Sequence, residues 1–209
     1  MGPSLADQPD PCAAAPASSL AIGLGANLGD PLATLVAVRP LLEQRLRGQQ
    51  LLRGSSLRLR WSPLMRTQPV GGPPEQPPYL NAVLLVEGGA GPVDPADAEA
   101  LLGQLQELEA RFGRRRREHW GPRTLDLDLL WWGDLRLQMP HLVLPHPLLD
   151  QRSFVLAPLM ALNPLMRVPE GLPSAGQTVQ TALNALQPGL RERPPEVLDV
   201  SWLWSVDLA

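Results

Sequence analysis

After a tail rich in alanine and proline, the chain opens with two segments of contrasting hydrophobic pattern. Residues 19–25 form a short apolar run that ends in glycines, which is typical of a first strand. In residues 29–48, Asp30 stands as an N-cap before Pro31, and leucines and valines then recur at helical spacing. This second segment predicts a helix with a candidate kink at Pro40.

The same alternation continues in the middle of the chain. Residues 55–66 are strand-like, residues 65–78 hold too many prolines and glycines for anything but an ordered loop, and residues 79–88 resume a strand. Residues 93–113 repeat the aspartate and proline signals of a helix start and carry an apolar stripe. Residues 124–138 then predict a strand with a candidate hairpin.

This order of elements indicates an α+β fold, a ferredoxin-like βαββαβ sandwich with an added C-terminal hairpin and helices. One short helix is predicted at residues 150–162 and another near residues 177–187. We predict a disordered N-terminal tail over residues 1–18, a single domain over residues 19–187 and a C-terminal extension over residues 188–209. The sequence leaves open whether either tail packs on the domain.

Composition limits the chemistry and the partners. A chain of 209 residues with a formal net charge of -3 fits one globular domain and offers no global attraction for nucleic acid. All eighteen basic residues are arginine, which excludes the lysines that P-loop proteins, protein kinases and Schiff-base enzymes require. Phosphate binding would therefore depend on arginine and backbone amides.

The cysteine count and the tail bear on localisation. Cys12 is the only cysteine, so an intrachain disulfide and a cysteine-based zinc site are excluded, and a reducing compartment is the simplest interpretation. The tail lacks basic residues, which argues against a targeting peptide, and no apolar run reaches the roughly 18 residues that span a bilayer. We predict a cytoplasmic protein with no membrane partner.

Two acidic residues interrupt the apolar strand predicted at residues 124–138. Side chains two positions apart in a strand project from one face, so Asp126 and Asp128 point the same way while the leucines between them enter the core. Such a pair suits a magnesium-bound nucleotide, because Mg²⁺ prefers one or two carboxylates together with phosphates and water. The alternative is an ordinary pair of solvent-facing residues.

Basic charge gathers just before these aspartates. Six of the eighteen arginines lie within thirteen residues, 111–123. They form either a solvated basic loop or a set of cations that a mobile, glycine-flanked loop brings over a polyphosphate. The two interpretations differ in whether the arginines face Asp126 and Asp128.

Three further positions are candidates for ligand contacts. Tyr79 and Asn81 share a strand face, and an aromatic ring beside an amide suits a flat heterocycle, although core packing would also explain the tyrosine. His146 is either a turn histidine or a ligand contact, and Asn27 either holds a turn or reaches a ligand. The glycines of residues 23–30 have the wrong spacing for a dinucleotide fold and fit a turn leading into a helix.

Four stretches together resemble a known family. They are AIGLGANLGDP, RTQPVG with EQPPYLNA, LEARFGRRRREHWGPRTLDLDLL, and LPHPLLDQRSFVLAPL, which cover roughly residues 20 to 165. The chain resembles the 6-hydroxymethyl-7,8-dihydropterin pyrophosphokinases of folate biosynthesis. The resemblance implies transfer of the β,γ-pyrophosphoryl group of ATP to the pterin hydroxymethyl oxygen, with release of AMP and with two Mg²⁺ ions. The implied partners are these small substrates alone, bound by a monomer.

The resemblance also implies roles for individual residues. Asp126 and Asp128 match the metal ligands, and the catalytic set adds Arg114, Arg116 and Arg123. A slip of one residue in the arginine run would select Arg115 and Arg117 instead. The pterin contacts are expected at Asn27, Thr67, Pro69, Val70, Tyr79, Asn81, Trp120 and Phe154. The ATP contacts are expected at Gln106, Glu109, Arg116, Trp120, Arg123, Leu129, His141, Val143, His146 and Arg152.

Two other functions are compatible with parts of the sequence. A ferredoxin-like module that binds RNA through the arginine run predicts affinity that falls steeply with salt, but the nearby acids oppose it. A homologue without activity that serves as a scaffold is opposed by the intact aspartate pair and Arg123.

Overall fold

The structure is a computed structural model, and it describes residues 19–48, 57–88, 93–115, 120–186, 195–200 and 203–204. The statements that follow concern these residues. The predicted N-terminal tail, Cys12 and Arg116 lie outside them.

The element order confirms the predicted α+β class and the βαββαβ core. The elements of the core are β1 (Leu20–Ala26), α1 (Pro31–Gly48), β2 (Arg58–Trp61), β3 (Met65–Thr67), β4 (Tyr79–Glu87), α2 (Pro95–Arg111) and β5 (Asp126–Trp132). The elements that follow are β6 (Leu137–Gln138), β7 (Val143–Leu144), a 3₁₀ turn (Leu149–Gln151), α3 (Ser153–Leu162), α4 (Val179–Ala185) and β8 (Glu196–Val197).

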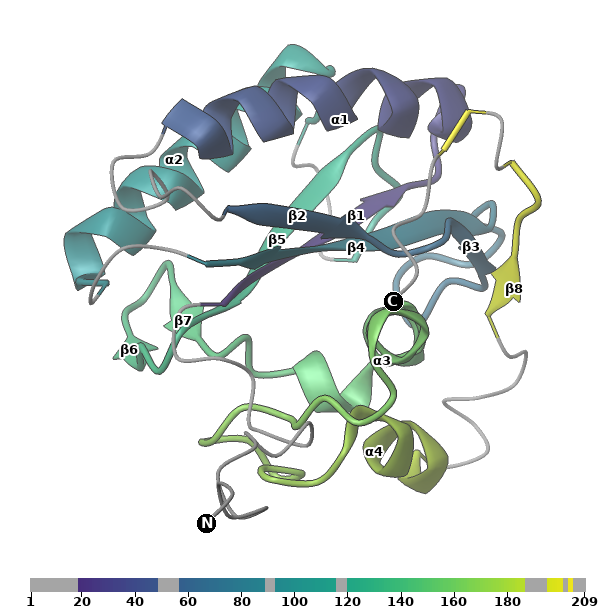
Figure 1. Ribbon diagram of the computed structural model, residues 1–209. Helices are drawn as coiled ribbons and strands as arrows, with labels where there is room; N and C mark the ends of the chain where they lie inside the picture. The colour runs from purple at the N-terminus through teal and green to yellow at the C-terminus, as the bar shows by residue number, and fades with distance from the viewer. Residues whose placement is uncertain are drawn as a thin grey trace, which may run out of the picture.

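The strands form an antiparallel sheet in the order β5-β1-β4-β3-β8, with β2 also paired to β4. Helices α1 and α2 cover one face of this sheet, and α3 and α4 lie against the other (Figure 1). Each split βαβ unit thus carries its helix on the same face, as the ferredoxin-like arrangement requires.

Two predicted elements differ in detail from those observed. The strand expected over residues 55–66 is divided into β2 and β3, because Pro63 has no N–H for the ladder and the side chain of Ser62 takes up the N–H of Val83. The hairpin expected within residues 124–138 is not formed, because β6 pairs with β7, which lies beyond that range, and not with β5. A turn after Trp132 directs the chain away from the sheet.

The caps explain why the two core helices begin where they do. Asp30 accepts a hydrogen bond from the N–H of Ala33 at 3.0 Å, and Asp94 forms a reciprocal capping box with Asp97 before α2. Pro40 lies inside α1, which continues to Gly48.

Strand alternation divides the apolar residues between two cores. In β1, Leu20, Ile22 and Leu24 face α1 and α2, whereas Ala21 faces α3 and α4. In β5, Leu127 and Leu129 belong to the first core, and the other face carries Asp126, Asp128 and then the buried Leu130. The aspartates therefore point to the side of the sheet on which α3 lies.

The C-terminal segment packs on the sheet wherever it is described. β8 pairs with β3, and the N–H of Leu198 donates to the carbonyl of Leu64 at 2.9 Å. Trp204 is 1% exposed, its ring stands nearly perpendicular to that of Trp61 at 5.1 Å, and its Nε1 donates to the Ser62 carbonyl at 2.8 Å. The segment thereby covers the edge of the strand that carries Thr67.

Among the described residues, no helix combines the length and the apolar character that crossing a bilayer demands.

We expect Trp204→Ala to lower the free energy of unfolding by about 3 to 5 kcal/mol, because it removes a large buried ring and a buried hydrogen bond. Urea denaturation followed by circular dichroism measures this loss. Leu203→Ala is the control, since Leu203 is 39% exposed and its truncation should cost about 1 kcal/mol or less. A Trp204→Ala variant as stable as the control would contradict a structural role for the segment.

Candidate active site

Two cavities meet above the first half of β5. The first has a volume of about 250 Å³ and lies between β4, the loop after β3 and the start of α3. The second has a volume of about 840 Å³ and lies between α2, β5 and the β6–β7 hairpin. The residues that line both are Trp120, Arg123, Asp126, Asp128 and Arg152.

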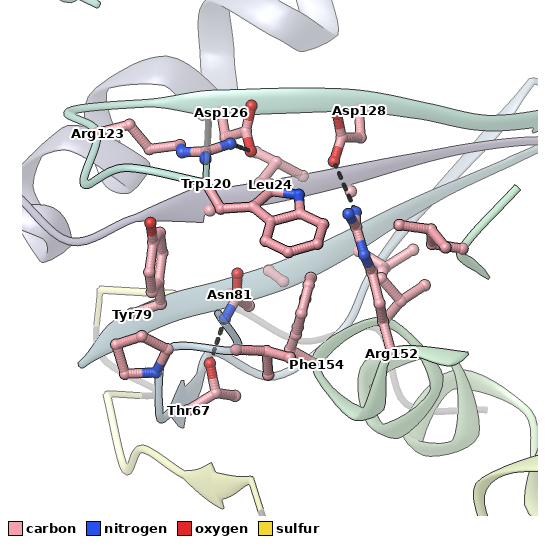
Figure 2. A pocket seen from close by; sticks show the side chains of 18 of the residues that line it. Leu24, Thr67, Tyr79, Asn81, Trp120, Arg123, Asp126, Asp128, Arg152 and Phe154 are labelled. Atoms are coloured by element: carbon pink, nitrogen blue, oxygen red, sulfur yellow. Dashed lines mark hydrogen bonds and ion pairs between the residues drawn. The ribbon is translucent and has the colours of Figure 1, made fainter. Parts of the chain in front are cut away.

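The first cavity gathers seven of the eight residues predicted to bind a heterocycle. They are Thr67, Pro69, Val70, Tyr79, Asn81, Trp120 and Phe154. Tyr79 and Phe154 stand on opposite sides of Asn81, and the indole of Trp120 lies above it (Figure 2). The Nδ2 of Asn81 donates to Thr67 Oγ1 at 2.6 Å, which fixes the orientation of the amide and leaves its oxygen to accept from a ligand.

Asn27 is the eighth, and it does not line this cavity. Its side chain is buried, its Oδ1 accepts from the N–H of Arg123 at 2.8 Å, and its Nδ2 donates to the carbonyl of Pro77 at 3.1 Å. These side-chain bonds lie outside the turn before α1, and they join the loop that carries Arg123 to the loop that carries Pro77.

Two glycines of β1 also form part of the first cavity, a contribution that the sequence did not reveal. The sequence predicts a turn before a helix for the glycines of residues 23–30, but Gly23 and Gly25 lie inside the strand and line the cavity. A Cβ on Gly25 would lie 2.8 Å from Asn81 Oδ1. Their spacing of two in a predicted strand was the available signal, because it places both on one face.

The second cavity brings together every residue predicted to bind ATP that the structure describes. They are Gln106, Glu109, Trp120, Arg123, Leu129, His141, Val143, His146 and Arg152. The cavity is about three times as large as the first, and its lining includes apolar side chains, among them Leu102, Leu129 and Leu142, as well as charged ones. A nucleotide has the same division between an apolar base and charged phosphates.

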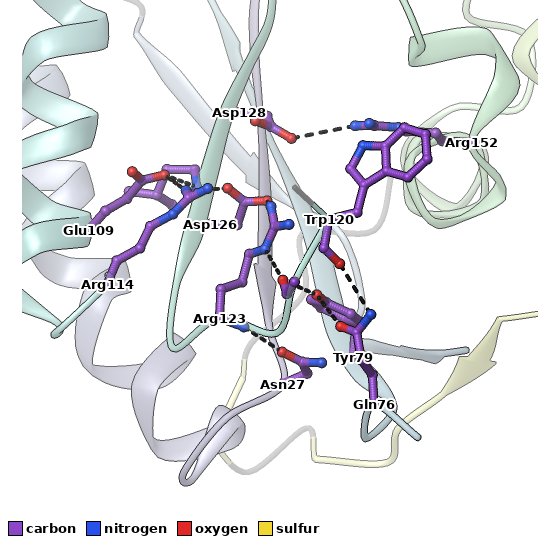
Figure 3. A network of polar contacts seen from close by, with 12 residues as sticks. Asn27, Gln76, Tyr79, Glu109, Arg114, Trp120, Arg123, Asp126, Asp128 and Arg152 are labelled. Atoms are coloured by element: carbon purple, nitrogen blue, oxygen red, sulfur yellow. Dashed lines mark hydrogen bonds and ion pairs between the residues drawn. The ribbon is translucent and has the colours of Figure 1, made fainter. Parts of the chain in front are cut away.

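The arginines face the aspartates. Asp126 accepts hydrogen bonds from Arg114 and from Arg123, and Arg114 also pairs with the buried Glu109 (Figure 3). Glu109 Oε1 further accepts from the N–H of Leu127 at 2.8 Å, so this carboxylate joins α2 to β5. For Arg114 and Arg123, the interpretation as an ordinary solvated loop is therefore excluded.

Asp128 is compensated more weakly. Among the described residues, the cation at ion-pair distance from it is Arg152, whose Nη1 lies 3.7 Å from Asp128 Oδ2. Burial, together with the charge of Asp126, raises the pKa of Asp128 to about 7, although the nearby arginines oppose this shift. Among the described residues, Asp126 thus has two arginines at ion-pair distance, whereas Asp128 has one.

These residues fit Mg²⁺. No cluster of three or more acidic, histidine or cysteine side chains suited to a metal occurs in the described part of the chain, so a cage built from protein ligands alone is absent there. Two carboxylates facing a cavity large enough for a nucleotide match the preference of Mg²⁺ for few protein ligands and several phosphate oxygens.

Gln76 is a further residue to which the sequence gave no role. Its Nε2 lies 3.1 Å from the Trp120 carbonyl, across a separation of 44 residues. The proline- and glycine-rich segment around it has no periodicity, so no local signal marked this position.

Comparison with known proteins gives the family. Residues 21–164 match the model of the family described as 7,8-dihydro-6-hydroxymethylpterin-pyrophosphokinase (HPPK). The 2-amino-4-hydroxy-6-hydroxymethyldihydropteridine pyrophosphokinase of Pseudomonas aeruginosa is 38% identical over 154 residues, which make up 72% of this chain and 83% of that protein.

Two further relatives carry the same name. The protein from Synechocystis is 35% identical over 173 residues, with 81% of this chain and 80% of the relative covered. The protein from Haemophilus influenzae is 36% identical over 141 residues, with 68% and 79% covered. With a family match over most of its length and relatives of this similarity, the chain belongs to the 7,8-dihydro-6-hydroxymethylpterin-pyrophosphokinase family.

Proposed function

We propose that this protein transfers the pyrophosphoryl group of ATP to 6-hydroxymethyl-7,8-dihydropterin in folate biosynthesis. The observation that carries the proposal is the meeting of two cavities at Asp126 and Asp128. One cavity has the aromatic and amide lining that suits a pterin, and the other has the size and the arginines that suit a nucleotide.

In this reaction the hydroxymethyl oxygen of the pterin attacks the β-phosphorus of ATP. The bond between the β-phosphorus and the oxygen of the α-phosphate breaks, AMP leaves, and the hydroxyl proton is released. No side chain of the described site stands out as a general base, so the protein acts mainly by positioning the reactants and neutralising charge.

The residues of the first cavity would hold the acceptor. Tyr79 and Phe154 offer ring faces on opposite sides of a flat ligand, and Trp120 covers it from above. Asn81 supplies a fixed amide for the polar edge. This arrangement directs the hydroxymethyl group toward β5, where Asp126 and Asp128 line both cavities.

The arginines around the aspartates would exchange partners when ATP binds. Arg114, Arg123 and Arg152 now neutralise carboxylates, and phosphate oxygens offer them bidentate contacts of similar geometry. Once released, Asp126 and Asp128 would hold two Mg²⁺ ions, which stabilise the charge on the phosphates during transfer. Arg116 stays a predicted catalytic residue outside the described residues.

The charge pattern also supports the predicted partners. Arginines that are already paired with carboxylates contribute little to a uniform basic surface, which is what nucleic-acid binding needs. We expect the protein to act on its two small substrates as a cytoplasmic monomer.

The nature of the nucleotide product tests the function. Purified protein incubated with ATP, Mg²⁺ and 6-hydroxymethyl-7,8-dihydropterin should yield AMP and the pterin diphosphate in equal amounts, as measured by ion-pair chromatography. Formation of ADP would instead show transfer of a single phosphoryl group and would refute the proposal.

Asp126→Asn should reduce kcat by at least about 100-fold while changing the Kd of the pterin by less than about 3-fold, because it removes a charge that acts on the phosphates. Steady-state kinetics and isothermal titration calorimetry measure the two quantities. Asp134→Asn serves as the matched control, since Asp134 is an exposed aspartate in the turn after the same strand. Normal Mg²⁺-dependent turnover by Asp126→Asn would rule out the metal assignment.

His146 should be neutral throughout the working pH range. Burial, and after it the charge of Arg152, lower its pKa to about 4, and its Nδ1 accepts from the N–H of Leu148 at 3.2 Å. In the unfolded chain the imidazole has its ordinary pKa of about 6.5, so this group lowers folding stability as the pH falls from about 6.5 toward 4.

Nuclear magnetic resonance of the histidine side chains checks this protonation state. The imidazole signals that disappear in His146→Gln should not shift between pH 8 and about 5.5. A titration midpoint between pH 6 and 7 would contradict the assignment.

A further inference from the structure

We propose that Gln76 is a positioning residue whose side-chain amide holds Trp120 over the first cavity. The proposal rests on the pyrophosphokinase function proposed above, because it makes Gln76 a determinant of pterin binding.

The backbone of Trp120 needs such a contact. Its φ of 55° lies in the left-handed region, which costs a residue with a Cβ on the order of 1 to 2 kcal/mol. Its side chain is 47% exposed, so apolar burial contributes less to fixing it than it does for the tryptophans of the core. The orientation of the indole therefore depends on what holds the peptide groups next to it.

The carbonyls of Trp120 and Gly121 are held from the loop that follows β3. Gln76 Nε2 lies 3.1 Å from the carbonyl of Trp120, and the hydroxyl of Tyr79 donates to the carbonyl of Gly121 at 3.2 Å (Figure 3). Arg123 Nε donates to the same Gly121 carbonyl at 3.1 Å. These bonds fix the two successive peptide groups that follow the Cα of Trp120. They thereby stabilise the left-handed φ of that residue.

Gln76 is itself held in place by its own loop. Its Nε2 lies 3.3 Å from the carbonyl of Gly71 and 3.2 Å from that of Pro73, and its Oε1 lies 3.4 Å from the Tyr79 hydroxyl, whose single proton it shares with the Gly121 carbonyl. A primary amide has two N–H groups, so its donors are shared among three acceptors, and a carboxylate in this place would repel all three. The donors of Gln76 are consequently the feature to test.

Gly71 and Gly72 have no side chains, which leaves space for the contact between Gln76 and Trp120. A Cβ on Gly72 would lie 2.2 Å from the Trp120 carbonyl oxygen and 2.5 Å from Gln76 Nε2. A Cβ on Gly71 would lie 2.7 Å from Cε3 of the indole. Both glycines also have positive φ, so the loop is shaped around Trp120 at two successive positions.

The consequence for function is a link between acceptor binding and the arginine-rich segment. Thr67, Pro69, Val70 and Tyr79 belong to the strand ends and the loop that line the first cavity, and Trp120 lies three residues after the end of the arginine run in the sequence. Loss of the Gln76 contact should release the indole from the cavity and weaken pterin binding, while the ATP contacts on α2 and β5 persist.

Gln76→Glu tests the proposal, because it keeps the size of the side chain and removes its N–H donors. We expect the KM of the pterin to rise about ten-fold, as the loss of one or two hydrogen bonds implies, and the KM of ATP to rise less, because the ATP contacts on α2 and β5 persist when Trp120 is displaced. Gln180→Glu is the matched control, since Gln180 is an exposed glutamine on α4.

Fluorine-19 nuclear magnetic resonance supplies a measurement that does not depend on activity. In protein labelled with 5-fluorotryptophan, the signal lost in Trp120→Phe identifies Trp120 among the six tryptophans. This signal should move in Gln76→Glu and also in Gly72→Ala, which displaces the Trp120 carbonyl sterically, and should stay unchanged in Gln180→Glu.

An unchanged Trp120 signal in Gln76→Glu, or an unchanged pterin KM despite a shifted signal, would overturn the positioning role. Failure of the unaltered protein to form AMP would refute the proposed function instead, and the fluorine signal would still decide whether Gln76 holds Trp120.

Discussion

Charge compensation at the start of β5 is the constraint on which the rest of the site depends. Asp126 and Asp128 project from a strand whose other face is part of the core, so they cannot turn away from each other. Two like charges at this spacing require cations, and the chain supplies Arg114, Arg123 and Arg152 from three different segments. Those segments form the walls of the second cavity.

The two faces of the sheet have different roles, since one packs against helices in the core and the other carries the candidate site. The face toward α1 and α2 is covered by apolar side chains along its length, whereas the other face is apolar only where α3 and α4 cover it. Outside the area that α3 and α4 cover, the glycines of β1 and the polar side chains of β4 and β5 line the first cavity. Because neighbouring residues of a strand alternate between faces, the same strands build the core and the site.

The loops complete this site through contacts between distant parts of the chain. Asn27 joins the end of β1 to Arg123 and Pro77, and Gln76 joins the proline-rich loop to Trp120. The C-terminal segment acts at the far edge, where β8 and Trp204 cover β3, the strand that presents Thr67. The aspartates, the cavity over β4 and the loop that covers it are therefore parts of one connected arrangement.

Local patterns in the sequence were enough to identify most elements. The caps at Asp30 and Asp94 predicted both core helices, and the alternation around Asp126 predicted a strand with both carboxylates on one face. These predictions succeeded because capping and strand alternation depend on residues only two to four positions apart. The family motifs supplied the candidate ligand contacts, and those described line the two cavities, apart from Asn27.

Tertiary structure decided the features that depend on distant residues. The division of β2 from β3 depends on Val83 as well as on Pro63, the turn after Trp132 is held by a hydrogen bond from the N–H of Gly133 to the carbonyl of Ser19, and the place of Trp204 depends on Trp61. The roles of Asn27 and Gln76 likewise arise from bonds to residues 44 to 96 positions away. A hydrogen bond of that range leaves no periodic signature in the chain, because its geometry exists only once the sheet has brought the two segments together.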